Sequence, residues 1–322
     1  MPPENPYDPA RFDASQASPE MRAIVEQIGQ MPMEMRTPEP SVEEAQRARE
    51  QFAEGPFKLA AESARAEERT IAGPAGNLTL RVILPAGEVR GAMLHIHGGG
   101  WVLGEPKMSD TGNEALADAL GLAIVSVDYR LAPEAPYPCG PDDCEAAALW
   151  LVENAKAEFG AAPDRIVVGG ESAGGHLTAV TTIRMKQRHG YSFRAANVVY
   201  GLHDLSGVPS HAEFDGRGLL LDSANIEWFT RCFVPDAALL RDPDVSPLYA
   251  DLGGLPPALF TVGTFDPLLD HSLFMHARWG AAGNVSELQV FPGAPHGFDA
   301  FPAPEAVAAR ARMASFLGEH LA

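Results

Sequence analysis

Apolar residues follow a helical period near the start of the chain. One amphipathic stripe carries Met21, Ile24, Val25 and Ile28. Spacings of three and four residues place these side chains on one face of a helix. Ser41 and Glu44 have the spacing of a capping box and predict a second helix over residues 41–54. No strand pattern precedes these two segments, so we expect both helices to lie outside any sheet.

Short aliphatic runs alternate with helical patterns from residue 67 onward. The runs predict strands over residues 69–72, 78–84, 91–96, 122–127, 165–168, 197–200, 258–262 and 286–291. Helical patterns cover residues 109–120, 141–159, 172–188, 268–281 and 303–321. The first two strands flank a Gly- and Pro-rich turn typical of an antiparallel hairpin. The later alternation predicts an α/β fold with a mostly parallel sheet and helices on both faces.

The alternation stops between residues 202 and 251. No clear strand pattern occurs there, although residues 224–232 have a helical pattern. A connection of about 50 residues is too long for an ordinary loop and indicates a functional insertion.

A tight turn is predicted between the strand ending near residue 168 and the following helix. Its sequence, Gly170-Glu171-Ser172-Ala173-Gly174, fits Gly-x-Ser-x-Gly in the strand–turn–helix context of a nucleophile elbow. The glycines relieve crowding where the serine backbone is strained. Ser172 would then be exposed at the carboxyl end of the sheet. The motif also arises by chance, so the rest of the chain has to decide its meaning.

Two further residues suit a serine nucleophile. Asp266 follows the predicted strand 258–262, and His296 follows the next strand in a Gly- and Pro-rich loop. The order Ser, Asp, His is that of one class of serine hydrolases. Asp270 is the alternative acid, but it lies a turn into the following helix, so we prefer Asp266.

Three consecutive glycines, 98–100, follow the strand 91–96. Their N–H groups are open to a ligand, and we expect those of Gly98 and Gly99 to join that of Ala173 around an oxyanion. His95 and His97 lie on one side of the same extended segment and would suit a metal pair. No third and fourth ligand has suitable spacing, so we do not expect zinc.

Composition and charge limit the kinds of molecule that the protein is expected to bind. The chain has 322 residues, a formal net charge of −19 and 46% hydrophobic residues. This negative charge repels nucleic acid and anionic membranes, so we expect a neutral small-molecule substrate. No apolar run approaches the ~20 residues of a membrane span, and the first residues do not resemble a signal peptide. Three cysteines fit a reducing cytoplasm, where we expect the protein to reside.

Several motifs together identify a resemblance. They are, in chain order, His97–Gly100, Asp128–Glu134, Gly170–Gly175, Asp266–Asp270 and His296–Phe298. In this combination the chain resembles the hormone-sensitive-lipase-like (bacterial family IV) esterases of the α/β-hydrolase superfamily, over about residues 65–320. The resemblance implies an α/β-hydrolase fold with a helical cap. It also implies a cap segment over residues 1–55, a catalytic domain over 56–322 and a cap insertion at about 202–240.

The resemblance also implies roles for single residues. Ser172 would be the nucleophile, His296 the base and Asp266 the residue that orients it. The oxyanion hole would comprise Gly98, Gly99 and Ala173, with His97 bracing the glycine loop. No cofactor or metal is implied. Glu171 stands where the family more often has Asp or Thr, and we expect it to support the site.

The predicted function is hydrolysis of short- to medium-chain esters through an acyl-enzyme. We expect Trp101, Trp228 and Phe229 to line the substrate pocket. Amide or carbamate hydrolysis by the same residues remains an alternative, as does a non-catalytic binding protein on this fold. The sequence leaves both a monomer and a homodimer open.

Overall fold

The computed structural model describes residues 7–30, 39–54, 62–214 and 219–322. These residues contain one eight-stranded sheet in the order β1-β2-β4-β3-β5-β6-β7-β8. The strands are β1 (Glu67–Gly73), β2 (Gly76–Ile83), β3 (Gly91–Ile96), β4 (Leu122–Val127), β5 (Ile166–Glu171), β6 (Ala196–Val199), β7 (Ala258–Phe265) and β8 (Ser286–Pro295). Strand β2 is antiparallel to β1 and β4, and the other neighbouring pairs are parallel. The expected hairpin and mostly parallel sheet are therefore confirmed.

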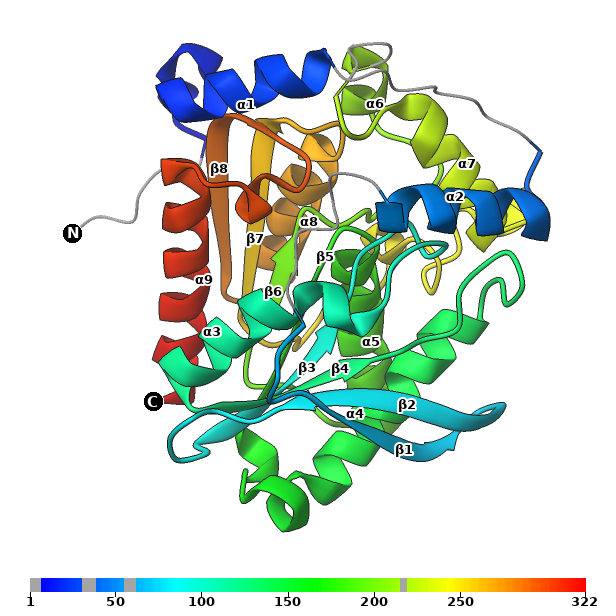
Figure 1. The fold of residues 1–322 in the computed structure, drawn as a ribbon, viewed down its shortest axis with the longest axis vertical. Coiled ribbons are helices and arrows are strands. Elements are labelled where there is room, and N and C mark those ends of the chain that lie inside the picture. The colour runs from blue at the N-terminus through cyan, green and yellow to red at the C-terminus, as the bar shows by residue number, and fades with distance from the viewer. Residues whose placement is uncertain (1–6, 31–38, 55–61, 215–218) are drawn as a thin grey trace.

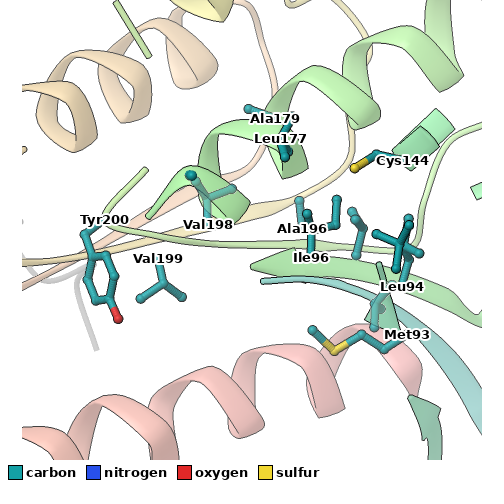
Figure 2. Close-up of a cluster of buried hydrophobic side chains, with 14 of the residues drawn as sticks. Met93, Leu94, Ile96, Cys144, Leu177, Ala179, Ala196, Val198, Val199 and Tyr200 are labelled. Atoms are coloured by element: carbon teal, nitrogen blue, oxygen red, sulfur yellow. The ribbon is translucent and has the colours of Figure 1, made fainter. Parts of the chain in front are cut away.

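Helices cover both faces of this sheet. Those packed on one face are α4 (Cys139–Phe159), α5 (Ala173–His189) and α8 (Leu269–Ala281). The other face carries α3 (Asp110–Leu120) and α9 (Pro304–Leu321). Figure 2 shows the two layers of side chains, with Met93 on the side of α9 and Cys144, Leu177 and Ala179 on the opposite side. Every residue of β3 and β4 is buried, which explains why their sequences are almost continuously apolar.

Four helices lie across one end of the molecule (Figure 1). They are α1 (Pro19–Gly29), α2 (Val42–Glu54), α6 (Pro209–Glu213) and α7 (Ser223–Phe233). Helix α1 buries Met21 and Ile28, as its stripe predicts. Ile28 packs with Phe214 and Leu219 in one apolar cluster. The beginning of the chain and the insertion after β6 therefore share a contact surface.

Helix α2 is fastened to the body by Arg49. Its guanidinium forms two hydrogen bonds of 2.6 and 2.7 Å with the Glu134 carboxylate and donates to the carbonyls of Val102 and Ala132. Arg49 also holds the pKa of Glu134 below its ordinary value. The helix starts at Val42, where the Ser41 hydroxyl accepts from the Glu44 N–H, as the capping spacing predicts.

Some features were missed or fall outside the described residues. The sequence pattern did not reveal α6 or the short 3₁₀ helices. Those helices are Pro9–Phe12, Ala14–Gln16, Pro106–Ser109, Pro163–Arg165, Ala237–Leu239, Pro247–Tyr249 and Phe298–Ala300. The expected boundary between residues 55 and 56, and the parts 1–6, 31–38 and 215–218 of the expected cap, lie outside the described ranges. Among the helices described, none combines the length and apolar character needed to cross a membrane.

Candidate active site

Ser172 sits in a strained turn between β5 and α5. Its backbone has φ 58° and ψ −120°, a combination that residues other than glycine rarely adopt. The neighbouring glycines are required by close packing on β3. A Cβ atom at Gly170 would lie 2.2 Å from the Ile96 carbonyl oxygen, and one at Gly174 only 1.9 Å from it. The expected elbow geometry is therefore present.

His296 and Asp266, which follow β8 and β7, meet Ser172 at the carboxyl edge of the sheet. The distance from His296 Nε2 to Ser172 Oγ is 2.9 Å, and that from His296 Nδ1 to Asp266 Oδ2 is 2.8 Å. The Asp266 side chain is fully buried, and its other oxygen accepts from the Leu268 N–H. With Nδ1–H donating to the carboxylate, Nε2 is left to accept the serine proton. The structure thus brings the three expected residues together.

Asp270, the alternative acid, has a different partner. Its carboxylate accepts from the Ser210 N–H at 2.8 Å, and the Ser210 hydroxyl donates to the Pro267 carbonyl. Asp270 therefore joins α6 to the segment that carries Asp266, whereas the contact with His296 belongs to Asp266.

The glycine loop after β3 approaches the elbow. The Gly98 N–H donates to Glu171 Oε1 at 3.2 Å, so it is already engaged within the protein. Among the described residues, no acceptor meets the N–H groups of Gly99, Gly100 or Ala173. Gly99 and Gly100 have φ of 114° and 60°, which turn this stretch of backbone sharply. The Gly98 N–H, one of the expected donors, thus has a partner within the protein, whereas the Gly99, Gly100 and Ala173 N–H groups have none among the described residues.

The chain matches the α/β-hydrolase fold family over residues 93–300. It is 36% identical to carboxylic ester hydrolase LipN of Mycobacterium tuberculosis, over 71% of this chain and 63% of LipN. Carboxylesterase NlhH of the same organism is 38% identical, over 73% of this chain and 75% of NlhH. A hyperthermophilic esterase from Pyrobaculum calidifontis superposes with a TM-score of 0.85 at 32% identity, covering 95% of this chain and 99% of that one. The chain belongs to the hormone-sensitive-lipase-like carboxylic ester hydrolases.

In this hydrolase His97, the residue before the three glycines, packs against the glycine loop and Tyr129. The His97 ring stacks on Tyr129 with centroids 4.3 Å apart, and its Nδ1 lies 2.7 Å from the Gly98 carbonyl oxygen. Burial lowers the pKa of His97 to about 4, so the ring is neutral at physiological pH. These contacts agree with the expected bracing of the loop.

Of the three expected pocket residues, only Phe229 lies against the glycine loop and is partly exposed. A Cβ atom at Gly100 would be 2.4 Å from the Phe229 ring. Trp228 is buried beside Phe229, with ring centroids 5.2 Å apart. Trp101, in contrast, stacks on Phe233 at 4.6 Å and donates to His176 Nδ1 at 3.0 Å. Trp101 is therefore part of the interior, which corrects its expected place in the pocket.

Phe233 joins the insertion to the main core. It packs on Trp101, and Ile226, Trp228 and Phe233 belong to the main buried cluster. Trp101, whose φ is 62°, thereby connects the glycine loop to the insertion.

Two residues beside His296 were not found by sequence reasoning. The Tyr200 ring contacts the His296 ring with centroids 4.7 Å apart, and its hydroxyl donates to Asp299 at 2.5 Å. Burial raises the pKa of both Tyr200 and Asp299. Tyr200 follows β6 at the same sheet edge as Ser172 and Asp266, and this position was the available signal.

A group of buried histidines lies behind the acid loop. His271 Nδ1 accepts from the N–H groups of His203 and Asp204, so its proton is on Nε2, 2.9 Å from His211 Nε2. Burial lowers the pKa of His176 to about 4 and of His203 to about 3. Burial also holds the pKa of His271 well below its ordinary value. These rings are neutral in the folded protein at physiological pH.

Because these histidines bind protons more readily when unfolded, stability should fall on acidification. Because the pKa of each ring is depressed in the folded state, the unfolded state binds more protons than the folded state below about pH 6.5. The free energy of unfolding therefore rises with pH in that range. His203 suits a test because neither ring nitrogen has a hydrogen-bond partner among the described residues. His203→Leu should reduce the pH dependence between pH 4 and 6 by about 1.4 kcal/mol per pH unit. Urea denaturation across this range measures it, and an unchanged slope would contradict the neutral assignment.

Proposed function

We propose that this hydrolase is a serine esterase for uncharged esters with short or medium acyl chains, with Ser172, His296 and Asp266 as its catalytic triad. The observation that carries the proposal is the continuous contact from Asp266 through His296 to Ser172, at 2.8 and 2.9 Å. The strained serine supports it, since such strain persists where the surroundings enforce it, often at functional sites. The net charge of −19 favours a neutral substrate over an anionic one.

The proposed reaction has two halves. His296 Nε2 takes the Ser172 proton while Oγ bonds to the ester carbonyl carbon, giving a tetrahedral oxyanion. Collapse breaks the bond to the alcohol oxygen, which receives the proton from His296, and leaves an acyl group on Ser172. His296 then takes a proton from water, whose oxygen attacks the acyl carbon, and the second collapse returns the proton to Ser172. Asp266 holds Nδ1–H and stabilises the imidazolium in both halves.

We assign the oxyanion hole to the N–H groups of Gly99, Gly100 and Ala173. Their lack of an acceptor among the described residues supports this assignment. Such donors stabilise charge that develops in the transition state, and losing one typically costs about 10²–10³ in rate.

We assign helices α1, α2, α6 and α7 to a cap over the site. The Ile28–Phe214–Leu219 cluster, which joins α1 to the insertion, supports this assignment. So does Arg49, which ties α2 to Val102, three residues beyond Gly99. A cap excludes water and shapes the acyl pocket. Phe229, packed beside Gly100, would limit the pocket's depth.

The triad is tested by a matched pair of substitutions four residues apart. Asp266→Asn should lower kcat by about 10⁴-fold, because the amide favours the wrong His296 tautomer. Asp270→Asn should change kcat far less, since Asp270 contacts Ser210. Both are measured on p-nitrophenyl butyrate, with Ser172→Ala as the inactive reference. A large loss of kcat in Asp270→Asn with little loss in Asp266→Asn would reject Asp266 as the acid of the triad. Full activity in Ser172→Ala would reject the mechanism.

The acyl-length limit is tested at Phe229. Phe229→Ala removes the ring beside Gly100 and should shift the optimum among p-nitrophenyl esters of two to twelve carbons toward longer chains. Phe274→Ala is the matched control, because that phenylalanine is on α8 and 39% exposed. The same profile in both variants would show that Phe229 does not set the acyl limit.

A further inference from the structure

Glu171, the residue before the nucleophile, makes contacts that the triad does not explain. Its carboxylate lies at the end of β5 and faces three donors. Oε1 accepts from the Gly98 N–H at 3.2 Å and from the Ser109 hydroxyl at 3.0 Å, and Oε2 lies 3.2 Å from His95 Nε2. Among the described residues, Glu171 makes no hydrogen bond with the Ser172 hydroxyl or with His296. The carboxylate therefore acts on the glycine loop and not on the triad.

The contact with Gly98 completes a clamp on one peptide bond. The carbonyl of the His97–Gly98 peptide accepts from the Tyr129 hydroxyl at 3.0 Å, while its N–H donates to Glu171. Hydrogen bonds at both ends fix the rotation of a planar peptide group. Gly99 and Gly100, which carry the next two N–H groups, have positive φ, and their turn is anchored further along. The Gly98 carbonyl oxygen lies 2.7 Å from His97 Nδ1, and the Gly99 carbonyl accepts from the N–H groups of Val102 and Leu103. The clamped His97–Gly98 peptide is the first plane of this anchored turn, so its orientation sets the direction in which the turn, with the Gly99 and Gly100 N–H groups, begins.

A second layer of hydrogen bonds orients Glu171 itself. Ser126 Oγ accepts from Asn113 Nδ2 at 3.2 Å and lies 2.9 Å from His95 Nδ1. Its hydroxyl proton is then available to His95 Nδ1, which places the ring proton on Nε2, facing Glu171. Burial raises the pKa of Glu171, but His95 and the donors Ser109 and Gly98 outweigh it and hold the pKa below its ordinary value. The charged Glu171 carboxylate thus faces three hydrogen-bond donors, from His95, Gly98 and Ser109.

We propose that Glu171, oriented by His95, is a positioning residue that fixes the His97–Gly98 peptide and so directs the Gly99 and Gly100 N–H groups at the oxyanion. This inference rests on the proposed acyl-transfer function. It explains a glutamate at this position, because its side chain reaches across to His95 on β3 and to Gly98 in the loop after β3.

The decisive variant is Glu171→Gln, which preserves size but removes the charge and one acceptor oxygen. Because the oxyanion exists only in the transition state, kcat should fall about 10- to 100-fold while KM stays within about twofold. A trifluoromethyl ketone forms a tetrahedral adduct with the serine. Its inhibition constant should rise by the same factor by which kcat/KM falls. A purely structural role would not produce this proportionality.

Glu145→Gln is the matched control. Glu145 also pairs with a histidine, His189, at 2.7 Å, and with Arg188, but at the opposite end of α5 from Ser172. Its kcat and ketone affinity should equal those of the unmodified protein. His95→Gln should reproduce part of the Glu171→Gln loss, and the double variant should lie within about twofold of Glu171→Gln alone, because both act through one network.

The outcomes separate the inference from the proposed function. Wild-type kcat in Glu171→Gln, a loss that appears in KM, or a kcat loss with unchanged ketone affinity would each overturn the positioning role. If Glu171→Gln does not fold, Glu171→Asp provides the same comparison, since its shorter side chain withdraws from Gly98. Peptide mapping of a fluorophosphonate adduct tests the function independently. Absence of label on Ser172 of the unmodified protein would reject the mechanism, whereas a labelled Ser172 with unaltered Glu171→Gln kinetics rejects only the inference.

Discussion

The close approach of the elbow to the end of β3 is the contact on which the rest of the site depends. The backbone at Gly170 and Gly174 passes so near the Ile96 carbonyl that neither position has room for a Cβ atom. Because β5 and β3 are neighbouring parallel strands, this contact holds the turn at the sheet edge and enforces the strained backbone of Ser172. It also brings the glycine loop, which continues from β3, beside the nucleophile.

The remaining groups reach this point from other strand ends. Asp266 follows β7, His296 follows β8 and Tyr200 follows β6, so the parallel sheet gathers them at one edge. Their side chains are fixed by different interactions: Asp266 by burial, and the His296 ring by Asp266 and Tyr200. The helices at this end add contacts to the same segments, since α6 meets the acid loop through Asp270. The nucleophile is thus held by the sheet, and the acid loop is held by the sheet and by α6.

The sequence predicted the features that depend on local pattern and failed where a distant contact decides. Strand and helix periods located the sheet, and the position of Asp266 directly after a strand distinguished it from Asp270. The sequence could not reveal that the Gly98 N–H has a partner within the protein, because that partner, the Glu171 carboxylate, is 73 residues away in the chain. Trp101 was misplaced because its ring packs inward on Phe233 and His176, contacts that no periodicity in the sequence reveals.

One glycine substitution tests most directly whether the β3–elbow contact creates the active site. Gly174→Ala puts a Cβ atom 1.9 Å from a backbone oxygen, whereas Gly280→Ala on α8 meets nothing within 4 Å. We predict that kcat/KM for p-nitrophenyl butyrate falls at least about 100-fold in folded Gly174→Ala, because displacing the turn misaligns Ser172. Gly280→Ala should retain the unmodified value. Equal kcat/KM in the two variants would contradict the claim that this contact positions the nucleophile.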